Sequence, residues 1–306
     1  MSVADKKNLK PPAYHRQRLL MFLVEQAGGT LEKLDLQKLL FLYVEASGRK
    51  HYRFIPYKFG CYSFLAADDV ALLGKKGWLA ITDNEVGLGV SLENQPWAVG
   101  NAERQEMSRW LSKNRLRGKA LIRKVYRNYP YYATRSEIKR QLLNANELEQ
   151  VNRAAEITGG TDPILFTLGY EGRPLEDYLN RLLQNGVKLL CDVRRIPLSR
   201  KFGFSKTALS NLLPKLDIAY CHLSELGIAS ENRRNLDSPM AYQTLFNDYR
   251  HSLPERKKEL KKITNFLQEH GRVALTCFER EPHRCHRHCI SDYIHEKYDT
   301  RVTHLR

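Results

Sequence analysis

The sequence has 306 residues, which at about 150 residues per domain predicts two domains and excludes a disordered tail or a disulfide-stapled mini-protein. Its 42% hydrophobic and 27% charged residues are ordinary for a globular protein, and no apolar run approaches the roughly 18 residues that cross a bilayer. Fifty Lys and Arg against 34 Asp and Glu leave a net charge of +16, which favours a polyanionic partner, nucleic acid first.

The first half of the chain is predicted to be mainly helical. Apolar residues recur at helical spacing and are followed by two short β-rich runs around a Gly-containing turn, which predicts helices over 14–27, 34–47 and 63–73 and strands over 78–81 and 89–92. Helices followed by a hairpin resemble a winged-helix plan. We therefore expect a helical, winged-helix-like N-terminal domain over residues 1–160, which binds nucleic acid or a partner.

Residues 103–150 form a basic segment, also expected to be mainly helical. It holds twelve Lys and Arg against five Glu, together with Tyr126, Tyr129, Tyr131 and Tyr132. Cations interleaved with aromatic rings suit a phosphate backbone and stacked bases. The alternative is a solvated helical face with tyrosines at the edge of the core.

The hydrophobic period changes after the stretch from Gly159 to Pro163, where we place the domain boundary. Apolar runs and helical segments then alternate, with strands expected at 164–168, 187–193, 218–222, 273–278 and 301–305 and helices at 175–184, 205–216, 240–251, 254–270 and 285–297. Strands that alternate with helices require a parallel sheet. Residues 161–306 are therefore expected to form a mostly parallel α/β sandwich, so that the fold class is α/β.

Polar and titratable residues follow four of these strands. Ligands of open α/β sheets bind in the crevice beyond the carboxyl ends of the strands, so we expect a functional site there. The predicted catalytic residues are Tyr170, Glu171, Asp192, Cys277, Glu279 and Cys285. The predicted phosphate- or nucleic-acid-binding residues are Arg194, Arg195, Arg200, Lys201, Lys206, Arg233, His286 and Arg287. Because three strand ends have to converge, Asp192, Arg194, Glu279 and Arg287 are expected to form one site whose replacement by Ala leaves the melting temperature nearly unchanged.

Two of these groups allow other interpretations. Asp192 and Arg194, two positions apart, could be an ion pair that positions the loop. The cysteines near the last helix could be reactive thiols with a lowered pKa, zinc ligands, or buried residues that behave as small hydrophobes. Zinc at Cys277, Cys285 and Cys289, with His283, His286 or His288 as the fourth ligand, is possible but disfavoured, because the C-x7-C-x3-C spacing lacks the short pairs of ordinary structural sites. No metal and no cofactor is predicted.

Several strings carry a resemblance to a known family. They are Leu168 to Gly172, Cys191-Asp192-Val193-Arg194, Phe202 to Lys206, and the run from Cys277-Phe278-Glu279 to Cys285-His286-Arg287. Over about residues 162–306 they look like the domain of unknown function 488 family. The resemblance implies no settled activity, although members look like nucleotide- or nucleic-acid-processing proteins encoded beside defence genes. Residues 15–80 are more faintly similar to Panacea-type antitoxin-like domains.

Together these features predict a cytoplasmic protein, since the polar, basic start lacks a signal peptide. We expect a nucleic-acid-binding protein, with DNA favoured over RNA, whose C-terminal domain acts on a nucleotide, nucleoside or base as a hydrolase or transferase in defence against foreign DNA. The alternative is a non-catalytic, antitoxin-like regulator that binds nucleic acid and senses a nucleotide ligand. Neither expectation includes a membrane. A P-loop, a G-x-G-x-x-G and a G-x-S-x-G string are all absent from the sequence, which disfavours an NTPase, a Rossmann dehydrogenase and an α/β-hydrolase.

Overall fold

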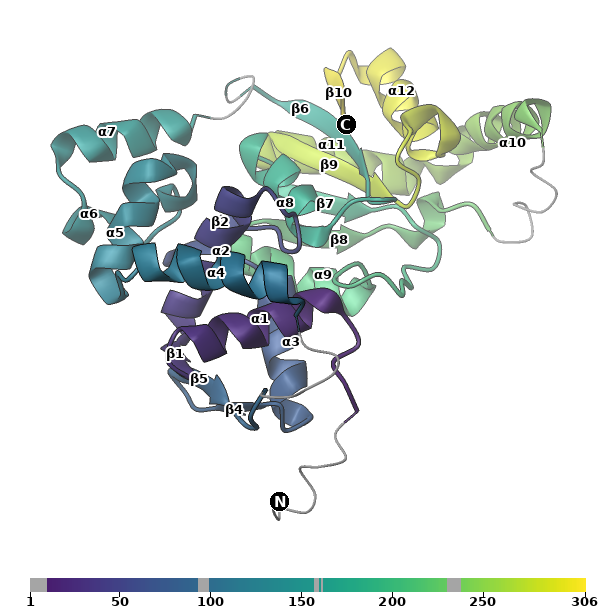
Figure 1. Cartoon of the computed structure of the whole chain (residues 1–306). Coiled ribbons are helices and arrows are strands. Elements are labelled where there is room, and N and C mark those ends of the chain that lie inside the picture. The colour runs from purple at the N-terminus through teal and green to yellow at the C-terminus, as the bar shows by residue number, and fades with distance from the viewer. Residues whose placement is uncertain (1–9, 93–98, 157–159, 161, 230–237) are drawn as a thin grey trace. The chain divides into compact units, whose positions relative to one another are not determined.

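The structure is a computed structural model of the chain and describes residues 10–92, 99–156, 160, 162–229 and 238–306. It contains two compact units, Met1–Ala155 and Glu156–Arg306 (Figure 1). The sequence predicts this boundary slightly later, between residues 160 and 161. Among the described residues, no helix has both the length and the apolar character needed to cross a membrane.

The N-terminal unit combines helices with small antiparallel sheets. Its elements are α1 (His15–Gln26), β1 (Thr30–Glu32), α2 (Lys33–Ser47), β2 (Ile55–Tyr57), β3 (Gly60–Tyr62), α3 (Phe64–Lys75), β4 (Leu79–Ile81), β5 (Glu85–Leu88), α4 (Asn101–Lys113), α5 (Gly118–Asn128), η2 (Pro130–Ala133), α6 (Lys139–Leu142) and α7 (Ala145–Ala154). Within the described part, one sheet has the order β1-β5-β4, and β2 pairs with β3 in a separate hairpin.

The strand predicted at 89–92 is wrong. In the hairpin that starts with β4, the second strand is β5, at Glu85–Leu88. The turn is made by Asp83-Asn84 rather than by the glycines. The Glu85 amide donates to Thr82 Oγ1 at 3.0 Å, and the Thr82 amide donates to the Glu85 carbonyl at 3.1 Å. Asp and Asn are typical turn residues, a signal that the prediction overlooked.

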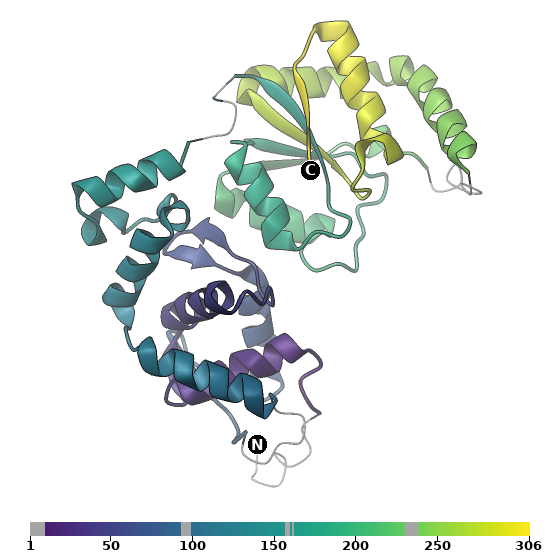
Figure 2. The same ribbon diagram turned by 45° about the horizontal axis from the view of Figure 1, so that its top comes forward.

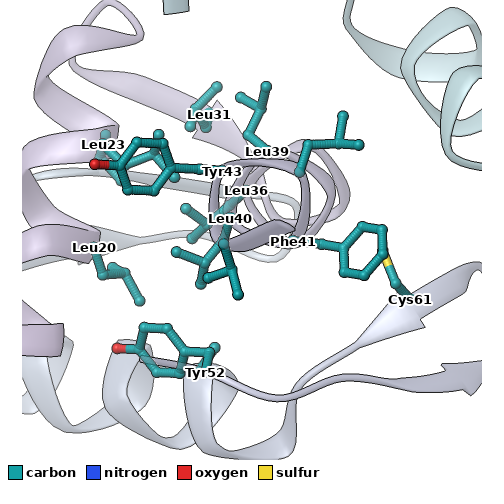
Figure 3. Packing of buried hydrophobic residues seen from close by; sticks show 14 of the residues in the cluster. Leu20, Leu23, Leu31, Leu36, Leu39, Leu40, Phe41, Tyr43, Tyr52 and Cys61 are labelled. Carbon is teal, nitrogen blue, oxygen red and sulfur yellow. The ribbon is translucent and has the colours of Figure 1, made fainter. Parts of the chain in front are cut away.

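Helix α2 lies at the centre of the N-terminal core. It is continuously apolar from Leu39 to Val44, and all residues from Asp35 to Val44 are buried, including the polar Asp35, Gln37 and Lys38, so the helix is covered on every side. Figure 3 shows Leu36, Leu39 and Leu40 of α2 among residues of other elements. Fully burying one such leucine contributes about 1.5–3 kcal/mol. The core therefore depends on this helix.

The tyrosines of the basic segment belong to the same core. Tyr126 is fully buried, and its hydroxyl lies 2.6 Å from Ser136 Oγ. The rings of Tyr129 and Tyr132 pack edge-on against Phe41, with centroids 4.9 and 4.6 Å away. Tyr126 is therefore part of the core, and the partly buried Tyr129 and Tyr132 pack at its edge, as the alternative interpretation expects.

The C-terminal unit is an α/β sandwich. Its elements are β6 (Ile164–Gly169), α8 (Leu175–Gln184), β7 (Leu189–Asp192), α9 (Lys206–Leu212), η3 (Leu213–Leu216), β8 (Ala219–His222), η4 (Ser224–Leu226), α10 (Pro239–Ser252), η6 (Leu253–Arg256), α11 (Lys257–His270), β9 (Arg272–Cys277), η7 (Pro282–Arg284), α12 (Arg287–Tyr298) and β10 (Val302–Leu305). Among the described residues the five strands form one parallel sheet in the order β10-β6-β9-β7-β8. Figure 2 shows α8 and α12 on opposite faces of this sheet.

Alternation along the strands separates the residues at the carboxyl edge. Cys191 and Cys277 belong to an apolar cluster with residues of α11 and α12. Asp192 and Thr276, which are register partners, point to the other face, where Tyr178 of α8 donates to Thr276 Oγ1 at 2.8 Å. Neighbouring positions of one strand therefore deliver side chains to different faces.

Candidate functional site

Asp192 and Arg194 form a buried ion pair at the end of β7. The Arg194 Nε and Nη2 groups donate to the two Asp192 carboxylate oxygens at 2.8 and 2.5 Å. Arg194 Nη1 donates to the Tyr170 hydroxyl at 2.8 Å and to the Phe204 carbonyl at 2.9 Å. The Tyr220 hydroxyl donates to Asp192 Oδ2 at 2.8 Å. Most hydrogen-bonding positions of both charged groups are thus occupied within the protein.

This network matches the ion-pair alternative for Asp192 and Arg194. Asp192 is fully buried and Arg194 is 5% exposed. Burial opposes the charge on Arg194, but the hydrogen bonds and charge of Asp192 outweigh it and raise the pKa of the guanidinium. Tyr170 is buried too, with its ring stacked on Phe204 at 4.4 Å. Arg194 therefore holds the loop after β7 in place. Its guanidinium group is bonded within the protein and does not point to a phosphate from solvent.

A second cluster lies on the face that carries α11 and α12. His286 Nε2 lies 2.9 Å from the Val193 carbonyl, and Nδ1 lies 3.9 Å from the sulfurs of both Cys277 and Cys285. Glu279 Oε2 lies 3.4 Å from Cys277 Sγ. The three ring and sulfur ligand atoms lie within 4.8 Å of one another.

Cys289 is separate from this cluster. Its sulfur contacts the Phe246 carbonyl and the His288 ring, at 3.9 and 3.5 Å. The three-cysteine arrangement weighed from the sequence is therefore not the one that the fold brings together. The reason is that Cys289 lies in the first turn of α12, whereas Cys285 precedes that helix.

The thiols of this region are shielded rather than activated. Burial strongly raises the pKa of the Cys285 thiol, and it raises the pKa of the Cys289 thiol to about 12. The reactive-thiol hypothesis required a lowered pKa, so for these two residues it is corrected. The helix start that was expected to stabilise a thiolate lies in a desolvated environment instead.

We expect a native-state alkylation experiment to label one cysteine. Of the six free cysteines, five are buried, and Cys221 alone is partly exposed. Intact-mass spectrometry after brief iodoacetamide treatment should give one adduct at Cys221 under native conditions and six after denaturation. Rapid native labelling of Cys277 or Cys285 would contradict the shielding.

Four cations gather near the carboxyl ends of β6 and β9. Arg173 Nε donates to the Gly169 carbonyl at 3.1 Å, while Arg287 Nη1 and Nη2 donate to the carbonyls of Glu279 and Arg280 at 2.5 and 2.8 Å. Gly169 packs closely on the Glu279 carbonyl, and a Cβ at this position would lie 1.8 Å from the carbonyl oxygen. The absence of a side chain at Gly169 thus lets the end of β6 contact the loop after β9. Lys201 Nζ donates to the Tyr170 carbonyl at 2.9 Å.

These cations repel one another. Burial lowers the pKa of the Arg173 guanidinium, and Arg280, Arg181 and Arg287 lower it further, while Asp177 opposes them. Burial also lowers the pKa of Lys201, and Arg173 adds to that effect against Glu171. In the described part of the chain, none of Arg173, Lys201, Arg280 and Arg287 forms an ion pair within 4.0 Å. We call these four residues the cation cluster.

Two nitrogens of the cation cluster are buried without a hydrogen-bond partner, Arg173 Nη2 and Arg287 Nε. Arg287 is fully buried and Arg173 is 6% exposed. A buried donor left without a partner costs about 1–3 kcal/mol, and more when it is charged. The cluster is therefore costly to the fold.

Contacts among the described residues divide the four residues that were expected to form one site, Asp192, Arg194, Glu279 and Arg287. Asp192 and Arg194 bind each other, whereas Glu279 lies 3.4 Å from Cys277, which belongs to the apolar cluster with α11 and α12. Arg287 donates to the carbonyls of Glu279 and Arg280 and is part of the cation cluster. Because Asp192 and Arg287 are fully buried and Arg194 is 5% exposed, we now expect their Ala variants to lower the melting temperature, contrary to the prediction from the sequence.

The other predicted residues lie apart from one another. Arg195 pairs with Glu225 at 3.0 Å in an exposed ion pair, and Glu171 accepts from the Arg280 amide at 3.0 Å. Arg200 is exposed on the loop before α9, and Lys206 is exposed in the first turn of that helix. Arg233 lies outside the described residues. The structure therefore does not bring the predicted loop cations together as one cluster; these are Arg194, Arg195, Arg200, Lys201 and Lys206.

Arg173 and Arg280 were not singled out from the sequence. Arg173 directly follows Gly169-Tyr-Glu-Gly, and Arg280 stands within the Cys277 to Arg287 run, so both follow strand ends. The signal that was missed is an Arg after each of two strands, β6 and β9, which pair with each other in the sheet. Strand order was needed to see it.

Comparison with known proteins gives one result, for the C-terminal unit. No curated protein and no solved structure matches the chain. The faint resemblance of residues 15–80 to Panacea-type domains is not shown by the comparisons. Residues 174–294 match the family model described as Domain of unknown function DUF488. The C-terminal unit of this chain therefore belongs to the DUF488 family.

Proposed function

We propose that this protein binds nucleic acid through its N-terminal unit and that its DUF488 domain binds a phosphate-bearing ligand at the cation cluster. The observation that carries the second part is a pair of buried guanidinium groups with unpartnered nitrogens, beside two more cations. An arrangement of like charges is expected where an anion supplies the missing partner.

The cation cluster is reachable through its outer members. Arg280 is exposed and Lys201 is partly exposed, whereas Arg173 and Arg287 lie beneath them. An anion that contacts Arg280 and Lys201 would feel the field of the two buried charges, which is weakly screened because they are removed from water. The place also agrees with the general rule that ligands of parallel sheets bind beyond the carboxyl ends of the strands.

Binding is favoured over turnover by the state of the predicted catalytic groups. Asp192 is engaged by Arg194 and Tyr220, whereas Glu279 lies beside Cys277. A pair of carboxylates for acid and base catalysis needs both groups at the same reacting bond. We therefore propose the non-catalytic alternative, a nucleic-acid-binding module that senses a phosphate-bearing ligand, ahead of a nucleotide-processing enzyme.

The N-terminal unit supports the nucleic-acid part of the proposal through its helices and charge. Its order of α1, β1, α2, α3, β4 and β5, with a β1-β5-β4 sheet, is compatible with the predicted winged-helix plan, which stays a prediction. Helix α3 would then be the recognition helix, yet its exposed face carries Asp68 and its cation is the terminal Lys75. Its charge is unsuited to a phosphate backbone.

Helices α4 and α5 and the turn between them suit that role better. Exposed cations on this stretch are Arg109, Lys113, Arg115, Lys119, Arg123 and Arg127. A hollow of about 550 Å³ beside α5 is lined by Arg123, Lys124 and Arg127 together with Glu147. Glu147 pairs with Arg123 and Arg127 at 3.4 and 2.9 Å, which leaves four exposed cations of this stretch without an ion pair in the described residues, Arg109, Lys113, Arg115 and Lys119. We propose that this stretch contacts the phosphates.

Duplex DNA binding is expected to depend steeply on salt. Each phosphate contact adds about 0.9 to the slope of log K against log salt concentration, so Arg115→Gln/Lys119→Gln should lower that slope by up to about 2. Fluorescence anisotropy with a labelled duplex at several salt concentrations measures both slopes.

The matched control is Lys257→Gln/Lys258→Gln, which removes the same charge from exposed positions of α11. It should leave the slope nearly unchanged. A flat salt response of the unmodified protein would refute the nucleic-acid proposal, and equal losses in both double variants would refute the assignment to α4 and α5.

A further inference from the structure

His286 is placed as a metal ligand usually is. Its Nε2 lies 2.9 Å from the Val193 carbonyl, and because a carbonyl can only accept, Nε2 carries the ring proton. In the neutral ring Nδ1 is then the acceptor nitrogen, and two sulfurs lie 3.9 Å from it. A histidine that binds a metal commonly donates its other N–H to a backbone carbonyl in this way.

The spacing of the three ligand atoms fits a tetrahedral ion. Zinc–sulfur bonds of about 2.3 Å and zinc–nitrogen bonds of about 2.0 Å place neighbouring ligand atoms roughly 3.5 Å apart. The two sulfur–nitrogen distances of 3.9 Å are a few tenths of an ångström longer, and all three atoms lie within 4.8 Å of one another. A small rotation of the two thiols would close the difference.

We propose that Cys277, Cys285 and His286 bind Zn²⁺, with the Glu279 carboxylate as the fourth ligand. Glu279 Oε2 lies 3.4 Å from Cys277 Sγ but outside the group of three atoms that lie within 4.8 Å of one another, so its side chain has to turn toward the other ligands to bind the ion. Thiolate, imidazole and carboxylate are all usual zinc ligands. This set keeps Cys277, Cys285 and His286, one of the three histidines weighed from the sequence as the fourth ligand, and it has Glu279 in place of Cys289.

The charges of the site agree with zinc. Two thiolates and one carboxylate bring −3 against +2 of the ion, and the neighbouring Arg287 cation interacts with Cys285 and Glu279's loop. Without a metal ion, the buried thiols of Cys277 and Cys285 would stay protonated. Metal binding releases those protons, so zinc affinity should rise with pH.

The proposed zinc has a structural role that is independent of the proposed function. Cys277 ends β9 and Cys285 and His286 immediately precede α12, so the ion would close the loop 278–284. That loop provides Arg280 and the two carbonyls that hold Arg287. Zinc would thereby fix the geometry of the cation cluster, although the cluster exists in the fold without it.

The test is metal analysis of the full-length protein, purified without a metal-affinity step. We expect about one zinc per chain by plasma mass spectrometry. Zinc-edge X-ray absorption of the unmodified protein should show two sulfurs at about 2.3 Å and two nitrogen or oxygen ligands at about 2.0 Å. Because this readout needs no substitution, it holds even if a variant fails to fold.

Two matched variants identify the ligands. Cys285→Ser should lose most of the zinc, whereas Cys289→Ser should keep it, although both residues are 1% exposed and close in sequence. Chelation should also lower the melting temperature of the unmodified protein. Less than a tenth of an equivalent after growth and refolding with zinc, a sulfur-free absorption spectrum, or equal zinc loss in both variants would each overturn the proposal.

Discussion

Asp192→Ala is expected to lower the free energy of unfolding of the C-terminal unit by about 3–5 kcal/mol. Removing one partner of a buried ion pair leaves an uncompensated charge in the interior. Here the residue left behind is Arg194, which is 5% exposed and would keep only its bonds to Tyr170 and Phe204. The substitution also removes the acceptor of the Tyr220 hydroxyl.

Chemical denaturation followed by two probes measures this effect. The three tryptophans are at positions 78, 97 and 110, all within Met1–Ala155, so their fluorescence reports the N-terminal unit. Far-UV circular dichroism reports both units. Asp192→Ala should shift the dichroism transition to lower denaturant while the fluorescence midpoint moves little.

The matched control is Glu225→Ala, which breaks the Arg195–Glu225 ion pair. That pair has side chains 43% and 62% exposed, so its loss should cost less than about 1 kcal/mol. Replacing both partners of the buried pair, as Asp192→Leu/Arg194→Met, should cost less than Asp192→Ala alone. If Asp192→Ala is as mild as Glu225→Ala, the buried network does not have the role assigned to it.

Much of the C-terminal fold could be predicted because its signals are local. The runs that became β6, β7 and β9 are short, apolar and separated by helical spacing, and strands that alternate with helices require parallel pairing. In the N-terminal unit, β1 is three residues long and alternates exposed and buried positions, too little for a periodic signal. Local patterns therefore gave every strand of the larger sheet, whereas in the smaller sheet they gave β4, misplaced β5 and missed β1.

The site could be predicted less well, because its geometry depends on strand order and register. Strand β9 comes late in the chain but pairs with both β6 and β7. Asp192 pairs with Thr276, so Cys277, one residue further, points to the other face. A shift of one residue in this register would have brought Asp192 and Cys277 to the same face. Nothing in the sequence fixes that register.

Burial was the other missing quantity. The string Cys285-His286-Arg287 at a helix start equally describes an exposed reactive thiol and a shielded cluster, and all three residues are at most 1% exposed. Solvent access decides the sign of the thiol's pKa shift, and it depends on α10 and α11, which pack over this region from other parts of the chain. Sequence motifs gave the right residues with the wrong environment.

Removing the two accessible members of the cation cluster should abolish most phosphate binding by the DUF488 domain. We expect the unmodified protein to bind deoxyadenosine 5′-monophosphate and to bind deoxyadenosine much more weakly, measured by isothermal titration calorimetry at low salt. A hydrogen bond to a charged group contributes about 1.5–3 kcal/mol, which is roughly a tenfold change in affinity or more. Lys201→Gln/Arg280→Gln should therefore weaken mononucleotide binding by at least about 100-fold.

The fold should tolerate these two changes better than changes beneath them. Glu171 is bound by the backbone amide of Arg280, not by its side chain, so Arg280→Gln leaves that contact in place. Arg287, in contrast, donates to two carbonyls from a fully buried position, and its replacement would disturb the loop itself. A melting temperature close to that of the unmodified protein confirms that a loss of binding is a local effect.

The decisive control is Arg200→Gln/Lys206→Gln. It removes the same charge from exposed positions of the basic loop that the sequence alone favoured as the phosphate site. If the cation cluster holds the phosphate, this control should change mononucleotide affinity by a few-fold at most, through the weaker long-range field. If instead the control loses binding and Lys201→Gln/Arg280→Gln keeps it, the loop before α9 is the phosphate site. If the unmodified protein binds neither the mononucleotide nor inorganic phosphate, the unpartnered nitrogens of Arg173 and Arg287 have no ligand of this class, and the proposed function of the DUF488 domain fails.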